Sequence, residues 1–396
     1  MRDDLLILTA TLAGLGLLLS PALRRAHLWR ATVTPLASII GSGFLVLGPI
    51  LNDSYGMWAP LVMLALCAGA WGFGATIRNN IARLDSHGPF TGPAATLERA
   101  GGWALAFSYI VSVAYYLNLF GAFALGLTPW SDPVFARGVT TAVFALILVI
   151  GWTRGFTALE RMEQYSVSLK LAIILGLLVG LALFFGARAQ AGDLILTPPS
   201  LSGWQALTLG FGLIVTVQGF ETSRYLGREY DAGTRIRSMK LAQLAATAIY
   251  MVYVLLLVFS LAPPAGKLTE TAIIGLMAQV SPVLPALLVA AALAAQFSAA
   301  VADTAGAGGL AVEQSGGRIP TRAAYAVLVL AGVALTWAAD VFQIIAWASR
   351  AFALYYAIEA ALAAISLWPT RRPTATGAAA LAALGLAIAI FGRAVE

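Results

Sequence analysis

About twelve long apolar segments, separated by short polar connections, make up most of this chain. A bilayer core about 30 Å thick needs about 20 predominantly apolar residues for each helix that crosses it. Each segment comes close to this length or exceeds it. The predicted spans are residues 4–22, 30–51, 57–77, 103–126, 134–152, 165–186, 204–226, 240–262, 282–303, 322–340, 342–368 and 374–392. The pattern predicts an all-α integral membrane protein built as a helical bundle.

Composition and charge agree with this prediction and orient the chain. The 396 residues are 60% hydrophobic and 11% charged, and their mean hydropathy of +0.85 excludes a soluble domain. In the connections between spans, sixteen Lys and Arg fall on one side and five on the other. Cytoplasmic loops retain positive charge, so we expect a multi-pass protein of the plasma (inner) membrane with both termini extracytoplasmic. The net charge of +6 therefore reflects topology and not nucleic-acid binding.

The first apolar segment is short enough to resemble a signal peptide. Residues 1–4 are net acidic, however, and the basic cluster follows the segment at Arg24, which favours an additional transmembrane helix. Cys67 is the sole cysteine and excludes an internal disulfide, while His27 and His87 lack metal-ligand spacing. We therefore expect no metal site and no cofactor. With no nucleophile–base pair visible, we also expect no enzyme activity.

Two short glycine-containing breaks interrupt otherwise apolar spans, at Gly41-Ser42-Gly43 and at Gly219-Phe220-Glu221. An unwound helix in hydrocarbon leaves N–H and C=O groups without partners, which is tolerated only where protein, water or a ligand satisfies them. Paired breaks in corresponding halves point to a transporter binding site. The alternative is that the glycines only allow close helix packing.

The breaks also divide the chain into corresponding halves. We expect an additional helix at residues 1–28, a first five-helix repeat at 29–187, an extracellular connector at 188–203, a second repeat at 204–368 and a C-terminal helix at 369–396. An odd number of spans in each half makes the second repeat inverted relative to the first. Each half then opens with its broken helix.

At this point the residues resemble a known family. The run Ser38–Phe44 (SIIGSGF) is similar to the first-helix signature of the amino acid–polyamine–organocation (APC) superfamily, and Val217–Thr222 (VQGFET) is similar to its sixth-helix motif. Gly316–Pro320 (GGRIP) resembles the loop that closes helix 8 in that family. The resemblance covers about residues 30–370. It implies the LeuT-type fold with a 5+5 inverted repeat, alternating access, and a substrate bound between helices 1 and 6.

The resemblance and the physics together give candidate substrate-binding residues. The N–H groups that start the second half of helix 1 suit a carboxylate, and the carbonyls freed in helix 6 suit an amino group. Phe220 is a candidate gate over the ligand. The candidates are Ile40, Gly41, Ser42, Gly43, Phe44, Val217, Gln218, Gly219 and Phe220. An aromatic-rich pocket could draw on Tyr109, Tyr115, Tyr116, Trp204, Phe211 and Phe220, although membrane aromatics often serve packing or interface anchoring.

Charged side chains inside spans cost enough to be functional candidates. With Ser298, which occupies a typical family position, the coupling and gating candidates are Lys170, Glu221, Arg224, Ser298, Asp303, Arg350 and Glu359. By the resemblance, the ammonium of Lys170 takes the place of a sodium ion, and the alternative is that it extends to the cytoplasmic interface. Asp303 lies at a similar depth and is a candidate partner for Lys170.

The acidic residue of the sixth-helix motif leaves the coupling open. By the resemblance, Glu221 takes part in proton sensing or gating. Arg224, three residues later, could face Glu221 and favour its ionised form. Proton coupling, a structural ion pair and simple exchange therefore all remain open.

The tenth core helix carries Arg350 and Glu359. Nine residues is two and a half helical turns, so these side chains project from roughly opposite faces and should not pair directly. Arg350 lies in the outer half of its span. It is a candidate for an acidic substrate group, for an extracellular gate or for a structural bridge to another helix.

The sequence therefore predicts a sodium-independent secondary transporter of amino acids or related amines that works by alternating access, with proton coupling or exchange. Its expected partners are a small-molecule substrate, protons and the lipid bilayer, with no nucleic acid. The alternative is a non-transporting ligand sensor, or a subunit of a heteromeric membrane complex, with the same fold.

Overall fold

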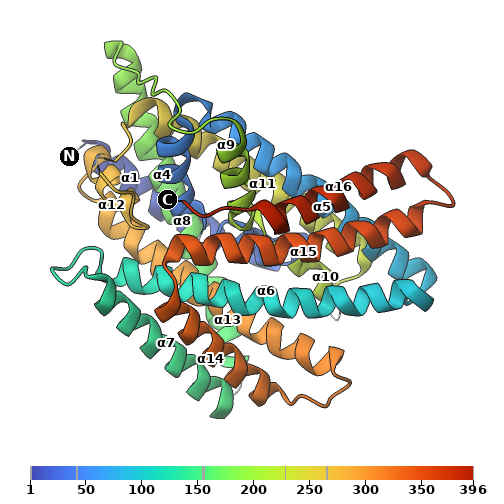
Figure 1. The fold of residues 1–396 in the computed structure, drawn as a ribbon. Helices are drawn as coiled ribbons and strands as arrows, with labels where there is room; N and C mark the ends of the chain where they lie inside the picture. The colour runs from blue at the N-terminus through green and yellow to red at the C-terminus, as the bar shows by residue number, and fades with distance from the viewer. Residues whose placement is uncertain (1, 42, 154–156, 228, 265, 396) are drawn as a thin grey trace.

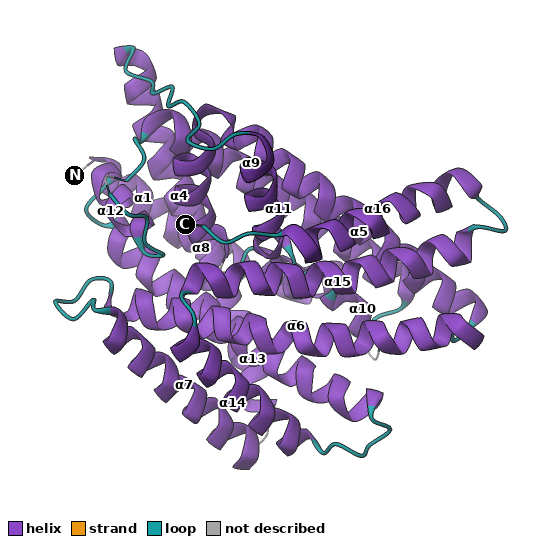
Figure 2. Ribbon diagram, in the orientation of Figure 1, coloured by secondary structure: helices purple, strands orange, loops and turns teal. Residues whose placement is uncertain are grey.

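The computed structural model describes residues 2–395 except 42, 154–156, 228 and 265. Every regular element in this described part is a helix (Figures 1 and 2). The first part of the chain forms α1 (Arg2–Leu18), α2 (Pro21–Arg25), α3 (His27–Ile39), α4 (Gly43–Tyr55), α5 (Ala59–His87), α6 (Gly92–Leu125), α7 (Pro133–Thr153) and α8 (Thr157–Ala191). The second part forms α9 (Gly203–Gly212), a 3-10 turn (Ile214–Val217), α10 (Thr222–Tyr225), α11 (Ala232–Ser260), α12 (Ala272–Val280), α13 (Leu284–Gln314), α14 (Thr321–Ala338), α15 (Val341–Leu367) and α16 (Arg372–Phe391).

Each predicted span has a helical counterpart. Within the described part, ten helical stretches are long and apolar enough to cross a membrane. The predicted spans 30–51 and 204–226 do not appear as separate stretches because each is broken: the first into α3 and α4, of which α4 is counted with α5 as Gly43–His87, and the second into α9, a 3-10 turn and α10. The all-α membrane fold predicted from the hydrophobic pattern is thus confirmed.

Helix α6 packs along both α13 and α15 through the middle of the bundle, and α7 and α14 form a pair on one side (Figure 1). Helix α1 packs along α8 at small residues. An added Cβ at Gly14 would lie 2.9 Å from Leu175, and one at Gly180 would lie 2.9 Å from Ile7. Small residues let membrane helices approach closely, which accounts for the position of the additional first helix.

An extended connector, residues 193–202, joins α8 to α9 along one end of the bundle. Its backbone is tied to three elements: Met57 N–H donates to Thr197 O (2.8 Å), Leu201 N–H donates to Ser54 O (3.1 Å), and Ile195 N–H donates to Phe259 O (2.9 Å). Both ends of the chain lie toward this same end (Figure 1). The connector thus holds the C-terminal ends of α4 and α11 beside α9.

Candidate functional site

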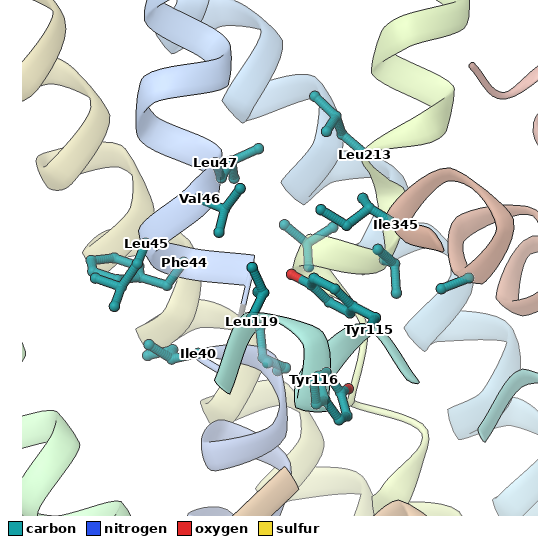
Figure 3. Close-up of a cluster of buried hydrophobic side chains, with 14 of the residues drawn as sticks. Ile40, Phe44, Leu45, Val46, Leu47, Tyr115, Tyr116, Leu119, Leu213 and Ile345 are labelled. Carbon is teal, nitrogen blue, oxygen red and sulfur yellow. The ribbon is translucent and has the colours of Figure 1, made fainter. Parts of the chain in front are cut away.

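The first break separates α3 from α4. The backbone leaves the helix at Ile40 (φ −83°, ψ 41°), and α4 begins at Gly43. Ile40 and Phe44 are fully buried on either side of the break (Figure 3). The first N–H groups of α4 lack helical acceptors, as they do at the start of any helix. Ser42 lies outside the described residues.

The second break separates α9 and its 3-10 turn from α10. The turn ends at Val217, Gln218 is extended (φ −81°, ψ 173°), and Gly219 has φ +117°, a conformation that favours glycine. Helix α10 begins only at Thr222. The glycine motif thus allows the helix to be interrupted between Val217 and Thr222.

The two breaks are in direct contact. A Cβ on Gly219 would lie 2.6 Å from the carbonyl carbon of Ser38, and a Cβ on Gly43 would lie 2.7 Å from the Cα of Thr216. Both glycines are therefore needed where one broken helix meets the other. Close packing, the alternative to a binding role, is real here, but it occurs where the helical segments end at the two breaks and not between two continuous helices.

Tyr250 of α11 joins the two breaks and was missed by the sequence reasoning. Its fully buried hydroxyl lies 2.9 Å from Ile39 O and 2.5 Å from Thr216 O, so its single O–H proton bonds one of these carbonyls or is shared between them. Each carbonyl was left without its helical partner by one of the breaks. No motif marks Tyr250, because a tyrosine in an apolar span is indistinguishable from a packing residue.

The Glu221 carboxylate accepts hydrogen bonds at the second break. Its Oε2 accepts from Gly219 N–H (2.9 Å) and from the Tyr356 hydroxyl (2.9 Å). The Tyr356 ring stacks with Phe220 (centroids 5.1 Å apart) and with Phe73 (5.2 Å). Glu221 and Phe220 are both buried, so the candidate gate Phe220 is held in an aromatic stack.

Two buried oxygens at the second break accept no hydrogen bond from the described residues: Gln218 Oε1 and Glu221 Oε1. The other end of the Gln218 amide donates to the Tyr116 hydroxyl (2.8 Å). Tyr115 and Tyr116 project from α6 into the region between the first break and Leu213 (Figure 3). Buried acceptors are normally satisfied, so this junction suits a ligand that donates hydrogen bonds.

Lys170 of α8 is 2% exposed, and its Nζ donates to Ala37 O (2.5 Å) in the last turn of α3. Helix C-termini favour cations, because their last carbonyls lack helical partners. The ammonium is thus buried against helix 1 and does not extend to the interface. The predicted pairing of Lys170 with Asp303 stays a prediction; Ser112 of α6 donates to the Asp303 carboxylate, and Ser298 lies half-buried on the same helix as Asp303.

Arg224 does not face Glu221, and the predicted pairing is wrong. Arg224 forms an ion pair with Glu98 of α6 (2.9 Å) and another with Glu359 of α15. The reason is geometric: Glu221 stands before the first turn of α10 and folds back onto Gly219 N–H, while Arg224 points away toward α6 and α15. Asn80 of α5 donates to the same Glu359 carboxylate (2.8 Å).

The sequence does not mark Glu98 as a functional candidate. It lies before the predicted span 103–126, and a charged residue outside a span is ordinary. In the structure α6 begins at Gly92, so Glu98 lies within the helix and reaches α10.

Arg350 is exposed, and its Nε donates to Ala389 O of α16 (2.7 Å). Of the roles considered for Arg350, this geometry matches the structural bridge. As expected from their spacing, Arg350 and Glu359 have different partners. Trp204 is 56% exposed and contacts Phe391, so it lies outside the aromatic group around Tyr356.

A membrane-crossing bundle whose two broken helices touch at their unwound segments defines a transporter of the LeuT-type fold. The family model described as "APC superfamily transporter" matches residues 21–392. This chain therefore belongs to the APC superfamily of transporters. The family and the fold are those of membrane transporters and not of enzymes.

Two known proteins resemble the chain. An uncharacterized protein of Aquifex aeolicus (strain VF5) is 42% identical over 370 residues, which are 91% of this chain and 89% of that protein. Mhp1, a nucleobase-cation-symport-1 family transporter solved in a closed conformation with bromovinylhydantoin bound, has a TM-score of 0.54 and 12% identity. That match covers 90% of this chain and 91% of Mhp1. At this identity the likeness shows the fold alone.

Proposed function

We propose that this protein is a sodium-independent secondary transporter of amino acids or related amines, with the substrate bound at the junction of the two broken helices. Alternating access moves the substrate, by proton coupling or by exchange. The single observation that carries the proposal is the contact between the two breaks, because it places unwound backbone from both halves around one point.

The position of Lys170 supports sodium independence. A sodium ion at the end of α3 would need carbonyl oxygens such as that of Ala37, and the Lys170 ammonium already binds this oxygen. A fixed positive charge at this point supplies the electrostatic stabilisation that a bound cation would provide. It also repels a second cation.

The chemistry of the junction supports a zwitterionic or amine substrate. Gln218 Oε1 and Glu221 Oε1 are buried acceptors, which suit an ammonium group with its three donors. The start of α4 at Gly43 supplies N–H donors for a carboxylate. A few placed polar groups in an aromatic and aliphatic surround are typical of small-molecule sites.

We place the protein in the plasma (inner) membrane with both termini extracytoplasmic, and we keep the division into repeats at 29–187 and 204–368. The common location of the two chain ends in Figure 1 supports this topology, since twelve crossings return the chain to the side on which it began. The sixteen-to-five distribution of loop Lys and Arg sets which side is cytoplasmic.

The first experiment is uptake of pooled labelled amino acids and amines into proteoliposomes without sodium, with and without an inward proton gradient. Uptake without sodium supports the proposal, and its dependence on the gradient separates proton coupling from exchange. Ligand-induced thermal stabilisation without flux would instead favour a sensor.

The Lys170→Met variant tests sodium independence. We expect it to lose at least tenfold of the sodium-free uptake, because Ala37 O loses its buried donor and the site loses its fixed charge. Lys240→Met, which changes an exposed lysine on α11, is the matched control and should keep the parent rate. Unchanged uptake in Lys170→Met would contradict the proposed role of Lys170.

A further inference from the structure

The residues that follow α16 also contact the rest of the protein. After Phe391 it leaves the helix at Gly392 in an extended conformation and returns between α9 and α15 (Figure 1). We call Gly392–Val395 the strap. Gly392 is buried, the other three residues are half-buried, and Val395 packs against the hydrophobic core.

The strap is bonded to the outer half of the broken sixth helix. Arg393 N–H donates to Thr208 O of α9 (2.9 Å). Thr208 is 1% exposed, so this is a buried backbone hydrogen bond between two distant parts of the chain. Such a bond restricts any movement of α9 relative to α16.

Gly212, the last residue of α9, lies directly beneath the strap. A Cβ at this position would overlap the Arg393 carbonyl oxygen, so only glycine allows the observed approach. From the other side, Ser349 of α15 donates to Gly212 O (2.6 Å) and accepts from Val215 N–H (3.1 Å). The end of α9 is therefore held between α15 and the strap, two residues before the 3-10 turn that leads into the break.

The strap also separates two cavities at the outer end of the bundle. The larger, of about 620 Å³, lies among the connections α6–α7, α11–α12 and α14–α15. The smaller, of about 160 Å³, lies between the outer ends of α4 and α9 and is lined by Ser54 and Leu209. Arg393, Ala394 and Val395 line both.

We propose that the strap is part of the extracytoplasmic gate: it must leave Thr208 and Gly212 before α9 can tilt and open the outer path to the junction. This rests on the proposed topology, in which this end faces outward. The strap closes the path with backbone contacts, so its closing action does not depend on the substrate that the protein carries.

A cysteine beneath the strap tests the proposal without transport or substrate. Ser54 is 2% exposed, lines the smaller cavity and uses no side-chain hydrogen bond among the described residues. In a Cys67→Ala background, Ser54→Cys reports how often this cavity opens to a membrane-impermeant maleimide added outside proteoliposomes. The labelling rate does not depend on a substrate. A failure of the proposed transport and a failure of the proposed strap opening can therefore be told apart.

Three changes should raise the labelling rate at least threefold. Arg393→Pro removes the N–H that donates to Thr208 O, Gly212→Ala places a methyl group against the strap, and a chain ending at Phe391 lacks the strap. Gly377→Ala adds a methyl group in open space on α16, so this control should label at the parent rate.

Thermal melting and gel filtration identify variants that have unfolded, and the three changes perturb different elements. Parent-like labelling in all folded variants would overturn the proposal. Equal acceleration by Gly377→Ala would also overturn it, because the faster labelling would then not depend on the contacts of the strap.

Discussion

The two halves of the broken sixth helix are held in opposite ways. In the proposed topology α10 is the inner half; it has four residues and is fixed by charge, through the ion pairs of Arg224 with Glu98 and Glu359. The outer half, α9, has ten residues and is fixed by neutral contacts: the Ser349 hydroxyl, the Tyr55 hydroxyl on Ala206 O (2.6 Å) and the strap.

This difference determines how much free energy is needed to release α10 and α9 from their contacts. Removing one partner of a buried ion pair costs about 3–5 kcal/mol, whereas a neutral hydrogen bond contributes about 0.5–1.5 kcal/mol. The inner contact thus depends mainly on one residue, and the outer contact is spread over several weak ones. A cavity of about 480 Å³ adjoins the inner ion pairs and is lined by Glu98, Arg224 and Glu359, of which Glu98 has the most exposed side chain.

The largest expected effect comes from Arg224→Met. It leaves Glu359, whose side chain is 2% exposed, without its cation, and we expect a loss of about 3–5 kcal/mol of stability. Chemical unfolding in a fixed detergent measures the loss. Since the inner contact is also broken, a cysteine near α10 should react faster with a permeant maleimide than in the parent.

The double variant Arg224→Met with Glu359→Met is the matched control. Replacing both partners by apolar groups removes the uncompensated charge, so most of the lost stability should return. If the double variant is as unstable as the single one, the ion pair is not what holds α10, and the contrast between the halves is wrong.

The contrast also explains what the sequence could and could not predict. The spans, the breaks and the in-span charges follow from hydropathy, glycine and desolvation cost. The partner of Arg224 did not follow, because the choice between Glu221 and Glu359 depends on where a four-residue helix begins. Tyr250 and the strap left no signal, since one is an ordinary aromatic residue and the other acts through backbone.

A smaller effect is expected at the outer half. Ser349→Ala leaves Gly212 O and Val215 N–H without their buried partner and should cost about 1–3 kcal/mol. The reporter at Ser54→Cys should label faster, while reactivity near α10 stays at the parent value. Thr376→Ala, on the exposed face of α16, is the control and should change neither. Faster labelling at both ends would show that the halves are coupled and not held separately.

The smallest effect is expected at Glu98, the exposed member of the inner cluster. Its side chain is 28% exposed, so solvent screens its pairing with Arg224, and Glu98→Gln should cost only about 0–1 kcal/mol. Because screening grows with ionic strength, the difference between Glu98→Gln and the parent should shrink from 0.05 to about 0.5 M salt. The Arg224→Met penalty, which arises from the buried Glu359, should change little over the same range. Equal salt sensitivity in the two variants would mean that the whole inner cluster is solvated, and the inner half would then be held no more tightly than the outer one.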